Sequence, residues 1–190
     1  MSAHESLLTQ SSDFVQVILT IPCKDSTKPI IRLPDHEPET FALFINWLYY
    51  KEKPVVGETS EELFNIECWQ LCKAWILGQK LQCPAFQNAV TSDLVEEIND
   101  YAELLGFDNR VIAYVYEHTR LDPTANLRQL IFQAFYNFGQ AGWVSRDNGD
   151  MNVLPKGFVF DLAEWFLEVT DWRHDDPMDR YIKAKWYLIK

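Results

Sequence analysis

The sequence predicts a mainly α-helical fold, and three observations favour it. Apolar residues recur at i, i+3, i+4 and i+7 over most of the 190 residues, for example at Phe41, Phe44, Ile45 and Leu48. Only seven Gly and nine Pro are present, fewer than a turn-dense all-β fold uses. Hydrophobic residues make up 47% of the chain, which allows a buried core and argues against intrinsic disorder.

Local signals in the first half of the chain place the elements. Pro38 suits the first turn of a helix, and Pro84 opens another in the same way. The β-branched run that ends at Leu33 is the one predicted strand, because Pro34 stops it. In order, we expect a helix at 6–19 with a polar break at 10–13, a strand at 30–33, a helix at 38–50, a loop at 51–60, and helices at 61–82 and 84–98.

The second half of the chain is also predicted to be helical. Asp122 and Asp176 each precede a proline, a pattern typical of a helix N-cap followed by the first turn. Gly106 marks a break, and we place a domain boundary there, between a domain at 1–100 and a C-terminal region at 101–190. We expect helices at 109–119, from 123 to 138, at about 158–169 and from 177 to 189, with a loop at 139–155.

The acidic balance of the chain limits its partners. The formal net charge is −11, so a phosphate backbone would be repelled over most of the surface. No apolar stretch reaches the roughly 18 residues that a membrane span needs, and no Lys or Arg precedes the apolar run at 14–21, as a secretory signal requires. We therefore expect a soluble intracellular protein, cytoplasmic or nuclear, that binds neither nucleic acid nor membranes.

Three of the four cysteines form the sharpest candidate for a metal site. Cys68, Cys72 and Cys83 fall on roughly one helical face. A single rigid helix cannot wrap a tetrahedral zinc ion with ligands three turns apart. The favoured interpretation is therefore three reduced cysteines in a buried core face, and no metal or cofactor is expected.

The search for catalytic groups yields no candidate residue. His174, Asp175 and Asp176 could bind a metal or act as an acid–base group, but their place before a proline favours a helix cap. Nucleophile elbows, phosphate loops and H-E-x-x-H motifs are absent from the sequence. Trp143 and Trp172 lie near predicted loops or helix ends, so they are candidates for exposed anchors that bind a partner.

Three segments follow one another in the order and spacing of a known family. They are HESLLTQSSDFVQVILT, IIRLPDHEPETFALFINWLYY and LCKAWILGQKLQCPAFQNAVTSDLV. Together they resemble the helix, the strand with its following helix, and the next helical pair of fungal BTB/POZ domains. Residues 101–138 resemble the helical, BACK-like tail of those domains. The resemblance implies a truncated α+β half-domain, with one short strand plus helices, followed by a helical region.

One part of the family's fold has no counterpart in this sequence. A full BTB domain begins with a dimerising helix and a strand hairpin, whereas the resemblance here begins near His4, at the end of that hairpin. Dimerisation by the family's usual route is therefore not implied. The strand would be left with an open edge, which makes Ile30, Ile31 and Leu33 candidates for contact with a protein partner.

The resemblance implies a non-enzymatic adaptor or scaffold that binds protein partners, among which the family implies cullin ubiquitin ligases or transcriptional co-regulators. A second hypothesis is a helical protein or enzyme that binds a small molecule, with a cavity at His118 or His174. A third is a degenerate relative that has lost the ancestral role. The second differs from the first in requiring a deep cavity with a carboxylate beside the imidazole.

Overall fold

A computed structural model describes seven stretches of the chain: 5–21, 31–51, 64–105, 109–119, 125–139, 154–171 and 183–189. Within them every regular element is helical, which confirms the predicted mainly α fold. The helices are α1 (Glu5–Ser11), α2 (Asp13–Thr20), α3 (Pro38–Tyr50), α4 (Phe64–Lys80), α5 (Pro84–Leu105), α6 (Asn109–His118), α7 (Asn126–Phe138), α8 (Lys156–Asp171) and the 3-10 turn η4 (Ala184–Trp186). None of these described helices has the length and apolarity to cross a bilayer.

The strand predicted at 30–33 is wrong for the part that the structure describes. Residues 31–33 have no regular structure and lead into a turn, in which the His36 amide donates to the Leu33 carbonyl oxygen at 3.2 Å. A strand needs a neighbour for its ladder of hydrogen bonds, and none of the described segments is a strand. Ile31 and Leu33 instead pack, half-buried, against the helical core.

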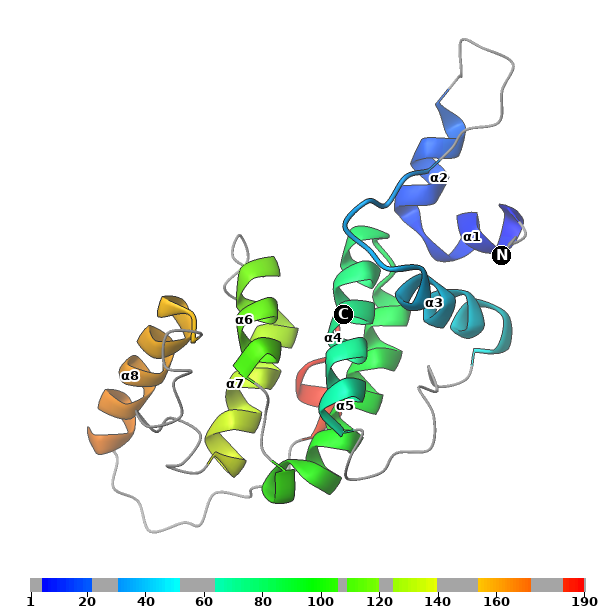
Figure 1. Cartoon of the computed structure of the whole chain (residues 1–190). Helices are drawn as coiled ribbons and strands as arrows, with labels where there is room; N and C mark the ends of the chain where they lie inside the picture. The colour runs from blue at the N-terminus through cyan, green and yellow to red at the C-terminus, as the bar shows by residue number, and fades with distance from the viewer. Residues whose placement is uncertain are drawn as a thin grey trace.

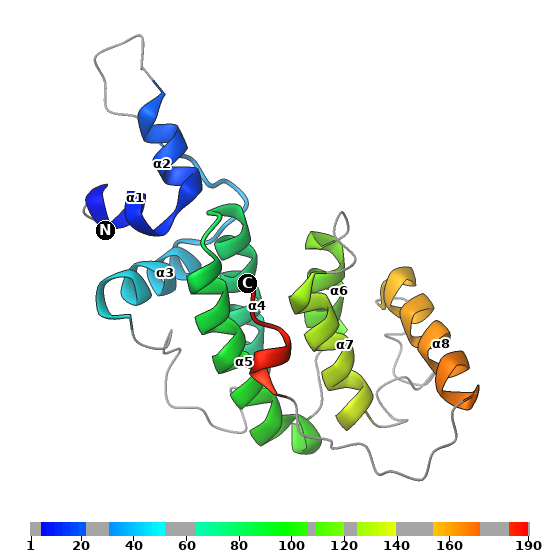
Figure 2. The same ribbon diagram turned by 180° about the vertical axis from the view of Figure 1, so that it is seen from behind.

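The helices form successive layers on either side of a central pair (Figure 1). Helices α4 and α5 lie side by side in both views, with α1, α2 and α3 on one side and α6, α7 and then α8 on the other (Figures 1 and 2). The turn η4 lies against α5, close to the C-terminus of the chain (Figure 2). This order leaves α8 at the edge of the molecule, where it contacts α6.

The sharp reversal between α4 and α5 follows from the local sequence. Gln82 adopts a left-handed conformation with φ of 50°, and the Cys83 amide donates back to the Gly78 carbonyl oxygen at 2.9 Å. This arrangement satisfies carbonyl groups that would otherwise be orphaned at the end of α4. Pro84 then begins α5 without losing an intrahelical donor. The turn therefore fixes α4 and α5 as a tightly packed pair.

Helices α4 and α5 pack closely at Gly78 because glycine has no Cβ atom. A Cβ atom there would lie 2.7 Å from Gln87 Cγ and 3.1 Å from Phe86 Cδ1. We expect Gly78→Ala to lower the free energy of unfolding by about 1–2 kcal/mol, because the strain of overpacking exceeds the gain in helix propensity. Gly157→Ala is the matched control, since its Cβ would make contacts no shorter than 3.4 Å. Urea denaturation, followed by circular dichroism, measures the stability of both variants. If Gly78→Ala stabilised the protein as much as Gly157→Ala does, the expectation would be contradicted.

One continuous hydrophobic core includes residues from both halves of the chain. Its largest side chains with almost no exposure come from α3 to α8 and from the turn between α4 and α5: Phe44, Phe86, Phe158, Leu48, Leu71, Leu77, Leu81, Leu94, Ile98, Ile112 and Leu127. The long helix expected at 61–82 is apolar over more than one face, which predicts a central position, and this is confirmed because α4 is buried along most of its length. The proposed division at residue 100 stays a prediction, and α5 runs through that position to Leu105.

Two predictions about helix ends are wrong. The helix predicted from 177 to 189 is reduced to the turn η4 in its described part, 183–189. There the Asn88 side chain donates to the Ile189 carbonyl oxygen at 2.9 Å and accepts from the Ile189 amide at 2.7 Å. These bonds occupy backbone groups that a helix would use. Helix α7 begins at Asn126 with Ala125 in its N-cap position, so the Asp-Pro pattern at 122–123 did not mark its start.

Candidate binding groove

The residues predicted to bind a partner lie in different surroundings. Ile31 and Leu33 are half-buried against the core and present only part of their surface. Ile30, Trp143 and Trp172 lie outside the described residues, so their role stays a prediction. The structure therefore does not bring these five residues together into one site.

The three candidate metal ligands are buried thiols. Cys68, Cys72 and Cys83 are each at most 1% exposed and carry no disulfide. Burial raises the pKa of all three above the ordinary range of a thiol, so they stay protonated at neutral pH. Their predicted place in a core face is confirmed. Among the described residues, no set of three or more His, Cys, Asp or Glu side chains is placed to hold a metal ion.

The histidine that a catalytic cavity would need lies on the surface. His118 is exposed at the end of α6, and its Nδ1 lies 2.8 Å from the Tyr114 carbonyl oxygen. Its ring packs against the Tyr114 ring, with centroids 3.9 Å apart. His174 lies outside the described residues. The part of the chain that the structure describes therefore does not place His118 in a deep cavity.

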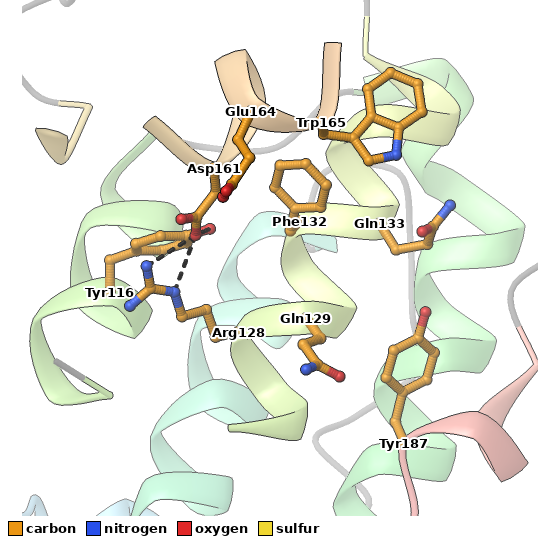
Figure 3. A pocket seen from close by; sticks show the side chains of 9 residues that line it. All are labelled: Tyr116, Arg128, Gln129, Phe132, Gln133, Asp161, Glu164, Trp165 and Tyr187. Atoms are coloured by element: carbon orange, nitrogen blue, oxygen red, sulfur yellow. Dashed lines mark hydrogen bonds and ion pairs between the residues drawn. The ribbon is translucent and has the colours of Figure 1, made fainter. Parts of the chain in front are cut away.

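An open groove of about 390 Å³ lies where α6, α7, α8 and the turn η4 meet (Figure 3). We call it the α7–α8 groove. Helix α7 lines it along one side, α8 along the other, and one residue each from α6 and the η4 segment completes it. Its lining residues are Tyr116, Arg128, Gln129, Phe132, Gln133, Asp161, Glu164, Trp165 and Tyr187.

At one end of the groove, Arg128, Asp161 and Tyr116 form a hydrogen-bonded network in which the charges of Arg128 and Asp161 are paired. The Arg128 guanidinium donates through Nη2 and Nε to Asp161 Oδ2, at 2.8 and 3.2 Å, and the Tyr116 hydroxyl donates to the same oxygen at 2.9 Å. The guanidinium also lies over the Tyr116 ring, 4.1 Å from its centroid. Burial and the bond to Asp161 raise the pKa of Tyr116, so its hydroxyl stays protonated and donates. The network joins α6, α7 and α8.

An aromatic cluster beneath this network holds α8 in place. Phe158 of α8 is fully buried and meets Tyr116, Phe135 and Phe132 edge-on, with centroids 5.4, 4.9 and 6.2 Å away. Edge-to-face pairs of this kind stabilise beyond the burial of their surface. The cluster explains why the groove keeps its form although α8 lies at the edge of the molecule.

The rest of the groove combines aromatic faces with uncharged polar groups and one carboxylate. Phe132 lies between Glu164 and Trp165, and Gln133 lies below Trp165 (Figure 3). Trp165 is half-buried, and its ring centroid lies 3.8 Å from that of Tyr136. Gln129 and Glu164 are exposed. Such a surface can bind apolar and hydrogen-bonding groups together, which is the common make-up of binding pockets.

No direct signal in the amino-acid pattern pointed to this groove. Its lining comes from four segments spread over residues 116–187, so no single stretch of the sequence contains it. The apolar helical position of Trp165 predicts a core residue, whereas the structure leaves it half-buried in the groove wall. The one available hint was Arg128 itself, a charged residue within an apolar stretch. A cation beside a stripe of core residues is seldom buried without an anionic partner.

Comparison with known proteins adds no relative of this chain: no family model, curated protein or solved structure matches it. The resemblance to BTB/POZ domains therefore rests on the sequence motifs alone. What the described residues define is a layered helical protein with an open, partly aromatic groove at one edge.

Proposed function

We propose that this chain is a non-catalytic protein-interaction module that uses the α7–α8 groove as a contact surface. The observation that carries the proposal is that the polar groups at one end of the groove are hydrogen-bonded to one another. Arg128, Tyr116 and Asp161 are committed to one another, so they brace the wall and leave no activated nucleophile or base. The remaining lining is aromatic and amide-bearing, a composition typical of interaction surfaces.

The motif order of the first half supports the same general class. BTB-like domains act as adaptors or scaffolds, and partners such as cullin ubiquitin ligases or transcriptional co-regulators are part of this proposal for the chain. Exposed apolar side chains on the described surface also favour contact with other proteins. Two of them, Phe160 and Leu167, lie on α8 and are 67% and 72% exposed.

A small-molecule ligand is the second candidate for the same groove. Its volume of about 390 Å³ lies within the range of roughly 300–1,000 Å³ that is common for ligand pockets. Against this candidate, the groove is open and offers few enclosed apolar contacts, whereas drug-sized ligands are mostly buried when bound. We therefore rank a protein partner first.

Site-specific photo-crosslinking of the full chain separates the two candidates. A photoreactive benzoyl-phenylalanine replaces Gln129 in the groove, and the control carries it in place of Glu39, which is exposed in the first turn of α3. After irradiation in extract of the source cell, we expect protein adducts at position 129 that are absent at position 39. Mass spectrometry that finds only adducts below about 1 kDa would favour the small-molecule candidate. Equal adducts at both positions would refute a specific groove.

A further inference from the structure

Among the described residues that line the α7–α8 groove, one charged group is left unpaired, and it is an anion. Glu164 lines the groove and is exposed, and no hydrogen bond or ion pair joins its carboxylate to another described residue. Of the lining residues that the structure describes, Arg128 is the one cation, and it is already bound to Asp161 and is only 11% exposed. The whole chain carries a net charge of −11. The groove is therefore complementary to a positively charged group.

Elsewhere the same chain shows how such a surface holds a cation. On α4, the Lys73 ammonium lies 2.7 Å from Glu37 Oε1 and 4.9 Å from the centre of the Trp69 ring. A carboxylate and an indole face thus share one ammonium group. In the groove, Glu164 and the Phe132 ring supply a carboxylate and an aromatic face in the same way, with the Glu164 carboxylate on one side of that ring and the Trp165 indole on the other (Figure 3). None of the described lining residues supplies the cation that would complete this arrangement.

Two amides extend the groove beyond this cation position. Gln129 and Gln133 lie one helical turn apart on α7, so both face the same side. The Gln133 amide donates to Asn137 Oδ1 at 2.7 Å, which fixes its orientation. Side-chain amides can both donate to and accept from the backbone of an extended peptide. This feature distinguishes a peptide from a small ammonium compound, which has no backbone to bind.

We propose that the α7–α8 groove binds a Lys or Arg side chain from an extended basic segment of a partner protein. The cation pairs with Glu164 and lies over the face of Phe132, while the amides of Gln129 and Gln133 bind the peptide backbone. This inference rests on the proposed function as an interaction module and names the chemical class of its partner.

A fluorescence anisotropy titration of the full chain with two labelled peptides tests the inference. The first is an acetylated Gly-Ser peptide with two lysines, and the second carries norleucine in their place, which keeps the aliphatic stem and removes the charge. We expect the lysine peptide to bind at least about 5-fold more tightly. Glu164→Gln should weaken that binding by about 5-fold, and Phe132→Leu by about 3-fold. Glu39→Gln, with the same loss of charge on an exposed residue of α3, should change it by less than 2-fold.

Three outcomes would overturn the inference. Equal binding of the two peptides would show that the groove does not select a cation. Equal weakening by Glu164→Gln and Glu39→Gln would show attraction to the acidic surface as a whole. If tetramethylammonium, used as a competitor, bound as tightly as the lysine peptide, the site would be assigned to a small ammonium compound. Specific protein adducts at position 129 would still support the proposed function in the first two cases, so the two failures are distinguishable.

Discussion

Replacing Phe158 with alanine is expected to lower the free energy of unfolding by about 3–5 kcal/mol. Phe158 has no exposed surface and packs edge-on against Tyr116, Phe135 and Phe132. Removing it leaves a cavity among three rings from α6 and α7, and these rings cannot all collapse into it. Denaturation in urea, followed by far-ultraviolet circular dichroism, measures the loss.

Phe160→Ala is the matched control for this experiment. It makes the same truncation two residues away on the same helix, where the side chain is 67% exposed. Its effect should stay within about 0.5 kcal/mol, as for most surface substitutions. If the two variants lost equal stability, Phe158 would not be the residue that anchors α8, and the groove that depends on α8 would have to be reconsidered.

Ser12→Ala is expected to cost about 2–3 kcal/mol, a large effect for a hydroxyl group. Ser12 is 1% exposed and lies at the break between α1 and α2. Its Oγ accepts from the Val15 amide at 3.2 Å, which caps α2, and donates to the carbonyl oxygen of Leu81 at the end of α4. Loss of the cap costs about 1 kcal/mol, and an unsatisfied buried carbonyl costs about 1–3 kcal/mol.

The control for Ser12 is Ser6→Ala, an exposed serine inside α1. Alanine favours a helix interior, so this variant should be neutral or slightly more stable. The thermal melting temperature and the urea midpoint should agree in ranking the two variants. Equal stability of Ser12→Ala and the unmodified chain would mean that water satisfies the Leu81 carbonyl in place of the hydroxyl.

Helical periodicity predicted most of this fold because the signal is local. The helix at 38–50 was placed at its observed bounds, and the polar break at 10–13 coincides with Ser12, the cap of α2. A stripe such as Phe41, Phe44 and Leu48 needs only a core to pack against, and any neighbouring helix provides one. The predicted burial of the cysteines was correct for the same reason.

The predictions that failed depended on partners distant in the sequence. The run at 30–33 has the composition of a strand, but its described residues have no strand to pair with. The apolar stripe before Ile189 predicted a helix, whereas Asn88, 101 residues away, binds the backbone there. The α7–α8 groove was missed for the same reason, since Arg128 and Asp161 come together only after α7 and α8 have packed.

The tight turn between α4 and α5 bears on the order in which the chain folds. Only residues 81–83 separate the two helices, so their contacts close a very short loop and cost little chain entropy. Contacts between residues close in sequence form rapidly, while those that fix α1, η4 and α8 need distant segments to meet. We therefore expect the α4–α5 hairpin to be the folding nucleus, on which the outer layers, and the groove last of all, assemble.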